Sequence, residues 1–302
     1  MTKASKWVLG ILAGLAVLSF LAIGFGVLLY IGATSDDGSV SSFGEKIAVI
    51  ELKGAINSSD QVVYQLKKHR ENRSIKAIVL RVDSPGGAVV PSQEIYEEVR
   101  KTRDAGKPII VSMGSLAASG GYYVSCGATK IVANRGTLTG SIGVISQFIQ
   151  IEQLLDKIGI GSATVKSGKL KDSGSPFRKF TEEDRKYWEV LIKDTYNQFV
   201  TVVERERHIP HKTLLGIADG RVFSGEQALE AGLVDTLGTY EDAVRIAADM
   251  VGIRGEPVVV KIKDRRPFGI FDLLFKSARE NLLEAKSELL DRDILQYKLP
   301  YP

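Results

Sequence analysis

The sequence predicts an α/β protein with a mostly parallel sheet, preceded by one N-terminal transmembrane helix. Three observations support this prediction. An apolar segment opens the chain, short β-branched runs then alternate with segments of helical periodicity, and glycine-rich turns follow two of those runs. Strand–helix–strand units of this length favour a parallel sheet with helices on its faces. The composition, 44% hydrophobic and 25% charged, excludes a chain that is disordered, collagen-like or coiled-coil throughout.

Charge and cysteine content exclude further classes of protein. The 302 residues include 40 Lys and Arg against 36 Asp and Glu, a net charge of +4. So small an excess argues against nucleic acid as a partner. Because Cys126 is the single cysteine, an intrachain disulfide and a multi-cysteine zinc site are both impossible.

Residues 7–33 contain no charged side chain. As a helix they would extend roughly 40 Å, enough to cross a hydrocarbon core of about 30 Å. The apolar region of a cleaved signal peptide, about 7–15 residues, would be shorter, so an uncleaved anchor is favoured. Lys3 and Lys6 precede the segment and Asp36 and Asp37 follow it. The positive-inside rule then predicts a single-pass protein of the cell membrane, with a cytoplasmic N-terminus and an extracytoplasmic main domain.

After a flexible Ser/Gly/Asp stalk, strand and helix patterns alternate. Apolar, β-branched runs predict strands over 47–52, 75–82 and 108–112. Helical spacing between them predicts helices over 59–72 and 92–103. The alternation therefore places the carboxyl ends of neighbouring strands at one edge of the sheet, where ligand sites of such folds lie.

Four helices are predicted in the second half of the chain. Thr181 with Asp184, and Ser224 with Gln227, have the spacing of helix-initiating capping boxes. The tail after the last helix is expected to be irregular. The expected helices cover residues 151–158, 181–208, 224–231 and 270–290.

Small residues follow two predicted strands. Residues 83–87 (DSPGG) come after the second strand, and residues 113–123 (MGSLAASGGYY) form a turn after the third that opens a helix through Cys126. A further small-residue turn, LTGSIG, covers 138–143. Each glycine pair is also explained by backbone freedom or tight helix–sheet packing alone.

Common catalytic constellations are missing. His69, His208 and His211 lie in polar stretches where exposed side chains are expected, so a Ser-His-Asp triad is not supported. The sequence has no HExxH motif and no phosphate-binding glycine loop. No metal and no organic cofactor is therefore predicted.

A serine with a lysine base remains. Ser119 precedes two glycines at a predicted helix start, where backbone N–H groups can hold an oxyanion. A lysine can accept the serine proton when its amine is neutral. Lys166, Lys169 and Lys171 lie in one polar loop, and their spacing does not choose among them.

Five motifs, in order behind a single anchor, resemble the signal peptide peptidase A family in its short, single-domain form. They are DSPGG at 83–87, MGSLAASGGYY at 113–123, LTGSIGV at 138–144, KSGKLKDSGSPFR at 166–178 and GRVFSGEQALEAGLVDTLG at 220–238. The resemblance covers about residues 45–260. It implies the Clp protease/crotonase-like fold and a serine endopeptidase.

The resemblance also implies the role of each site residue. Ser119 matches the nucleophile, Lys171 the general base and Ser141 a serine that orients this lysine. Gly86 and Gly120 match the oxyanion hole. It further implies a homo-oligomer whose active sites are shared between subunits, and peptide substrates, above all cleaved signal peptides.

These inferences divide the chain into four parts: a cytoplasmic stub and anchor at 1–33, a stalk at 34–44, a Ser/Lys peptidase domain at 45–263 and a C-terminal helix and tail at 264–302. Other functions remain open. The chain could be a membrane-anchored peptide-binding scaffold, or a protease dedicated to one membrane-protein partner. A crotonase-like acyl-CoA enzyme fits less well, because the anchor places the domain outside the cytoplasm.

Overall fold

The computed structural model describes residues 14, 17–21, 24–25, 45–261 and 296–298. The chain divides into two compact units, residues 1–44 and 45–302. Among the described residues, no helix has both the length and the apolar character needed to span a membrane. The expected anchor, the stalk and the helix at 270–290 fall almost wholly outside the described residues. The anchor therefore stays a prediction.

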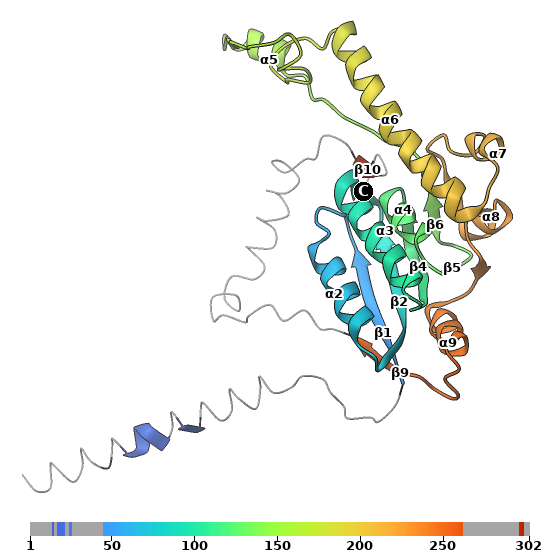
Figure 1. The fold of residues 1–302 in the computed structure, drawn as a ribbon. Helices are drawn as coiled ribbons and strands as arrows, with labels where there is room; N and C mark the ends of the chain where they lie inside the picture. Colours follow the sequence, from blue (N-terminus) through green and yellow to red (C-terminus); the bar gives the residue numbers. More distant parts are fainter. Residues whose placement is uncertain (1–13, 15–16, 22–23, 26–44, 262–295, 299–302) are drawn as a thin grey trace, which may run out of the picture. The chain divides into compact units, whose positions relative to one another are not determined.

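The second unit is built on an eight-stranded sheet in which parallel pairs predominate (Figure 1). Its main path has the order β7-β6-β4-β2-β1-β9, with β5 pairing β4 and β8 pairing β5. Only the β6–β7 pair is antiparallel among the described pairs of this sheet. The α/β class and the mostly parallel sheet are thus confirmed. The strands are β1 (Lys46–Lys53), β2 (Ile75–Ser84), β4 (Ile109–Ala118), β5 (Lys130–Ala133), β6 (Leu138–Gly140), β7 (Val222–Ser224), β8 (Thr236–Leu237) and β9 (Val258–Lys261).

Helices cover both faces of the sheet because the central strands are apolar on both sides. Side chains of a strand alternate between faces. In β1, Ile47 and Val49 pack in the smaller core cluster with α9, whereas Ala48 and Ile50 belong to the larger cluster with α2, α3 and α4. The helices are α2 (Asp60–Glu71), α3 (Val89–Asp104), α4 (Gly120–Cys126), α5 (Glu152–Lys157), α6 (Glu182–Arg207), α7 (His211–Leu215), α8 (Gly225–Glu230) and α9 (Tyr240–Met250).

The predicted capping boxes are present. The Thr181 side chain at the start of α6 accepts a hydrogen bond from the Asp184 N–H, and the Asp184 carboxylate accepts one from the Thr181 N–H. Ser224 and Gln227 form the same reciprocal pair at the start of α8. Each box satisfies two N–H groups that the helix cannot. The local sequence therefore determines where both helices begin.

Several segments differ from the prediction, among them the third strand, the tail and the turn expected at 138–143, which begins as β6. The third strand was expected to end at 112, but β4 continues to Ala118, past a register irregularity opposite Val82–Ser84. Asp83 causes this extension in part, because its Oδ1 accepts a hydrogen bond from the Leu116 N–H at 3.1 Å. The tail was expected to be irregular, but β10 (Gln296–Lys298) pairs antiparallel with β3 (Gly86–Ala88).

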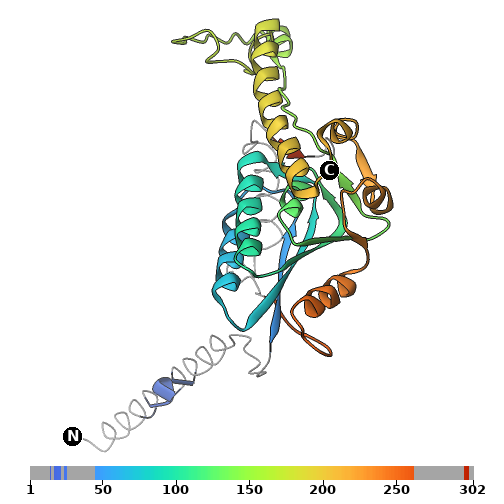
Figure 2. The same ribbon diagram turned by 45° about the vertical axis from the view of Figure 1, so that its right-hand side comes forward.

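An arm projects beyond the sheet. It contains the segment from about 144 to 181 with α5, and the N-terminal half of α6, at the opposite end of α6 from α4 (Figure 2). The C-terminal half of α6 packs on the main body, where the rings of Phe199 and Tyr123 lie 5.1 Å apart. The outer end has its own aromatic cluster. The centre of the Phe148 ring lies 5.4 Å from that of Phe180 and 4.7 Å from that of Trp188.

Candidate active site

Ser119 occupies the junction between β4 and α4. Its backbone φ is 53° and ψ is −117°, a conformation that non-glycine residues adopt only when the surroundings impose it. Here the Ser119 N–H donates to the Gly140 carbonyl at 2.8 Å, and its carbonyl accepts from the Tyr123 N–H at 2.8 Å. The residue is 1% exposed, and its hydroxyl has no hydrogen-bond partner among the residues that the structure describes. A buried, unpartnered hydroxyl in a strained backbone indicates a functional position.

Ser141 lies beside this junction. It follows β6, whose last residue, Gly140, pairs with Ala118 of β4. Ser141 has a φ of 51°, is 5% exposed and donates its N–H to the Arg221 carbonyl at 2.8 Å. Ser119, Ser141 and the exposed His208 are the non-glycine residues with positive φ in the described part of the chain. Two of these three strained residues therefore lie on adjoining strand ends.

The glycine turn after β2 packs against the start of α4. A Cβ on Gly121 would lie 3.0 Å from the Ser84 carbonyl oxygen, so the two turns are in close backbone contact. Gly87 is still more confined, since a Cβ there would lie 2.5 Å from the Ile56 nitrogen. These close approaches leave little room for a side chain, which explains why both positions are glycine. The two glycine-rich turns therefore lie next to each other, as predicted.

The two expected oxyanion donors differ in their partners. The Gly86 N–H donates to Ser84 Oγ at 3.1 Å, while the Ser84 hydroxyl donates to the Gly54 carbonyl at 2.6 Å. Gly120 is the first residue of α4, so its N–H has no acceptor within that helix. Sequence reasoning missed Ser84, although it lies in the DSPGG motif. Its hydroxyl must release the Gly86 N–H before that group can bind an oxyanion.

The structure does not bring Lys171 to Ser119 within one chain. Lys171 lies in the segment between α5 and α6, and Figure 1 shows α5 at the opposite end of α6 from α4, the helix that Ser119 precedes. Among the described residues, the Ser119 hydroxyl has no hydrogen-bond partner. The three lysines of this loop are not equivalent. Lys166 Nζ pairs with Asp172 Oδ1 at 2.6 Å, and Lys169 Nζ pairs with Glu183 Oε2 at 2.5 Å. The Lys171 ammonium makes no hydrogen bond or ion pair with the part of the chain that the structure describes.

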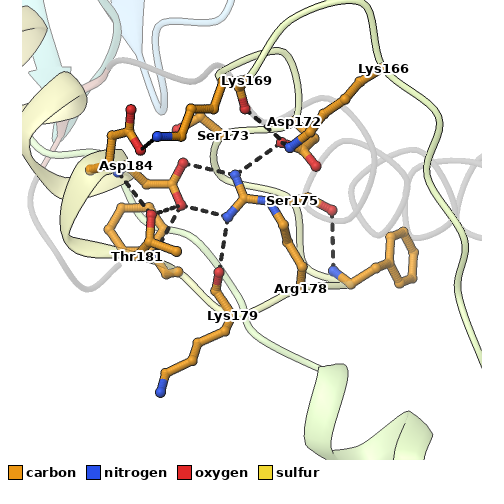
Figure 3. A network of polar contacts seen from close by, with 12 residues as sticks. Lys166, Lys169, Asp172, Ser173, Ser175, Arg178, Lys179, Thr181 and Asp184 are labelled. Atoms are coloured by element: carbon orange, nitrogen blue, oxygen red, sulfur yellow. Dashed lines mark hydrogen bonds and ion pairs between the residues drawn. The ribbon is translucent and has the colours of Figure 1, made fainter.

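A charged network holds the same loop to the start of α6 (Figure 3). The Arg178 guanidinium donates to Asp184 Oδ2 at 2.5 Å, to Asp184 Oδ1 at 2.8 Å and to Asp172 Oδ1 at 3.0 Å. Asp184 also accepts from Thr181 Oγ1 at 2.8 Å. These donors, Arg178 first, hold the pKa of Asp184 well below its ordinary value.

The edge of β3 is occupied by an extended segment of the same chain. Tyr297 lies opposite Gly87 and Lys298 opposite Gly86. A strand that adds to an exposed sheet edge is bound through its backbone, largely independent of its side chains. The glycine turn beside Ser119 therefore has an edge that pairs with an extended strand.

Other reactive groups lie elsewhere. His69 was expected to be exposed, and this prediction is wrong: it is 3% exposed, and neither ring nitrogen has a hydrogen-bond partner in the described part of the chain. His208 and His211 are exposed, as predicted. Burial raises the pKa of the Cys126 thiol to about 12, so a thiolate nucleophile is not available there. Within the described residues, no three His, Cys, Asp or Glu side chains are grouped to hold a metal.

Comparison with known proteins places the chain among peptidases. The profile described as Peptidase family S49 matches residues 101–254, just over half of the chain, and the Clp protease profile matches residues 39–160. A putative protease of Synechocystis sp. is 43% identical over 225 residues, covering 74% of this chain and 81% of the relative. A putative protease of Methanocaldococcus jannaschii is 35% identical over 280 residues, 88% and 89% of the two chains. A putative signal peptide peptidase SppA of Enterococcus faecium is 44% identical over 180 residues, 60% of this chain and 52% of the relative.

The fold and these matches define a serine peptidase with a Clp protease-like α/β fold. The chain belongs to peptidase family S49, among the serine proteases of the SppA and protease 4 type.

Proposed function

We propose that this chain is a membrane-anchored serine endopeptidase with a Ser119/Lys171 dyad, acting on cleaved signal peptides and other extended peptides. The observation that carries the proposal is the Ser119 hydroxyl, which is buried and has no partner among the described residues, at a strained strand–helix junction beside an edge that pairs with an extended strand. An enclosed hydroxyl without a partner is poorly satisfied in the free protein. The Ser119 hydroxyl gains a hydrogen-bond partner when the lysine amine and a substrate carbonyl reach it.

In the proposed reaction, Lys171 in its neutral form takes the proton of Ser119 as the hydroxyl oxygen attacks the peptide carbonyl. The Gly120 N–H, together with the Gly86 N–H once Ser84 has released it, stabilises the oxyanion. The protonated lysine then donates its proton to the departing amine, which leaves an acyl-serine. Water hydrolyses this ester, and the lysine accepts and returns the proton. Ser141, on the adjoining strand end, orients the lysine.

Lys171 is the favoured base because its two neighbours are engaged. Lys166 and Lys169 each have a carboxylate partner, whereas Lys171 has none among the described residues, so its amine can reach a serine without breaking an ion pair. Its place on the projecting arm supports a site completed by a second subunit. Exposed apolar side chains on the arm also support self-association, since a soluble surface seldom leaves so many uncovered. They include Ile149, Leu154, Ile158, Ile160, Val165 and Val190.

The membrane location rests on the apolar segment at 7–33 and its flanking charges. Within this segment the described residues 17–21 are helical, with exposed apolar side chains. An anchor of this orientation places the catalytic domain at the extracytoplasmic face. Signal peptides released into the same bilayer would then be nearby extended, apolar substrates.

Mixing two inactive variants tests the dyad and its division between subunits. Ser119→Ala and Lys171→Ala would be prepared separately as full-length protein in detergent, then mixed after dissociation and reassembly. A fluorogenic peptide of signal-peptide composition at pH 8 reports cleavage. Each variant alone should be inactive, while random mixing should restore about a quarter of the sites, namely those with an intact serine and an intact lysine from different subunits.

Each outcome has a distinct meaning. Recovery on mixing supports a shared dyad, whereas activity of Lys171→Ala alone contradicts the assigned base. Two inactive variants without recovery, in verified mixed oligomers, would mean that both residues act within one subunit. An inactive wild-type protein in its intact oligomer would favour the peptide-binding scaffold or a protease that needs its own membrane-protein partner. A wild-type rate that does not rise between pH 6 and pH 10 would also count against a lysine base.

A further inference from the structure

We propose that Arg178 is a positioning residue for Lys171, acting through the carboxylate of Asp172. The inference rests on the proposed role of Lys171 as the base. Arg178 is on the same loop but is not itself expected to touch substrate. Its side chain links the loop to the first turn of α6 (Figure 3).

The first step is the anchor. Asp184 is the third residue of α6, its side chain is 2% exposed, and the capping box with Thr181 fixes it. Arg178 binds both oxygens of this carboxylate, a geometry that restricts the guanidinium in direction as well as distance. The same guanidinium reaches Asp172, whose side chain is 12% exposed. Because Asp184 is fixed at the helix end, Arg178 also holds Asp172, the residue after Lys171, in place.

The second step is the backbone that leads away from Lys171. Ser173 accepts a 3.0 Å hydrogen bond from Trp188 Nε1 of α6, and its N–H donates to the Leu170 carbonyl at 3.1 Å. Gly174 has a φ of 87°, and a Cβ there would lie 2.5 Å from the Phe148 ring. The residues that follow Lys171 are therefore held from several directions. Lys171 therefore carries an ammonium without a partner among the described residues, on a backbone whose position is fixed.

The third step concerns charge. Asp172 is the carboxylate adjacent to Lys171, and it is engaged by Arg178 and Lys166, which lower its pKa. Both cations bind Oδ1 of Asp172, so without Arg178 only Lys166 holds this carboxylate, which can then turn toward the Lys171 ammonium. Such pairing would hold the lysine in the charged form that cannot act as a base. The charged groups of the loop are Lys166, Lys169, Lys171, Asp172, Arg178 and Lys179, and those of the first turn of α6 are Glu182, Glu183, Asp184 and Arg185.

A purely structural role would give a different result. If Arg178 only stabilised the arm, its loss would lower the rate equally at every pH. If it also withdraws Asp172 from Lys171, its loss must move the pH dependence, and removal of the Asp172 charge must reverse that shift. The pH profile of kcat/KM therefore separates the two roles.

The experiment compares Arg178→Gln, Arg178→Lys and the double variant Arg178→Gln/Asp172→Asn with wild type, as full-length oligomers from pH 6 to pH 10. Arg178→Gln should lower kcat/KM on the order of 10-fold to 100-fold, the range that follows from small misplacement of a catalytic group. Its half-maximal pH should rise by about half a unit, as an exposed ion pair produces. The double variant should return this pH to the wild-type value while most of the loss remains. Arg178→Lys should recover part of the rate.

Arg185→Gln is the matched control. Arg185 lies on the same first turns of α6 and is 57% exposed; its guanidinium lies 3.5 Å from Glu182 and 6.0 Å from the centre of the Phe180 ring. It should retain the wild-type rate and pH profile. Should Arg178→Gln fail to assemble, Asp172→Asn alone tests the link, because it removes the contact without leaving a free carboxylate. Its rate should fall with no upward shift of the half-maximal pH.

The results that overturn the proposal are specific. An unchanged rate in Arg178→Gln, or an equal loss at every pH that the double variant does not alter, excludes positioning through Asp172. An active Lys171→Ala overturns the proposed base, and this inference with it. An inactive Lys171→Ala beside an unaffected Arg178→Gln leaves the base in place and removes only the role of Arg178.

Discussion

Acidification is expected to destabilise this protein through one buried side chain, His69 of α2. The ring is 3% exposed, and both of its nitrogens lack hydrogen-bond partners. Burial first, and then the charges of Lys68 and Lys107, lower its pKa from 6.5 to about 4. The folded protein therefore resists binding a proton that the unfolded chain accepts below pH 6.5.

The size of the effect follows from these two values. A group whose pKa is lower in the folded state contributes its full stability above the unfolded value of 6.5, and loses it as the pH falls toward about 4. Each pKa unit corresponds to about 1.4 kcal/mol, so the whole shift amounts to about 3 kcal/mol. At pH 5 the loss relative to pH 7.5 should be about 2 kcal/mol.

Urea unfolding at pH 7.5, 6 and 5 measures this loss. His69→Leu removes the titrating ring and keeps an apolar side chain of similar size, so its stability should fall less over the same interval. The difference between wild type and variant isolates His69 from the carboxylates that titrate at lower pH. Parallel curves for the two proteins between pH 7.5 and pH 5 would refute the assignment of a buried, neutral histidine.

Other predictions concern the site and its surroundings. Gly87→Ala should lower the free energy of unfolding by about 1–3 kcal/mol and abolish peptide cleavage, because its Cβ would overlap the Ile56 backbone, whereas Gly136→Ala, in open space, should alter neither. Truncation of residues 296–302 should raise kcat/KM for peptides several-fold by freeing the edge of β3, and an unchanged value would mean that this strand does not compete with substrate. Lys169→Ala should leave kcat/KM within about twofold, because its exposed ion pair contributes little, and complete loss of cleavage would show that this lysine is the base.

Local patterns in the sequence predict those parts of the structure that depend on neighbouring residues. The apolar run of β2 and the capping box of Thr181 with Asp184 are found where they were expected. The end of β4 and the burial of His69 are not, because both depend on partners distant along the chain. The extension of β4 depends on Asp83 of the neighbouring strand, which accepts a hydrogen bond from the Leu116 N–H. The sequence around His69 is polar, although one face of α2 is buried in the folded protein. Neither contact leaves a periodic signal.

For the candidate site, the sequence by itself determined the family motifs, the α/β class, the glycine turns at adjoining strand ends and the choice of Ser119. These follow from residue type and short spacing. Only the tertiary structure decided that Ser119 and Ser141 share one strained junction, that Ser84 holds the Gly86 N–H, and that Asp172 is bound by Arg178. The physical reason is that strain, burial and ion pairing are properties of contacts between segments. The chain acquires those contacts only when its strands and helices pack together.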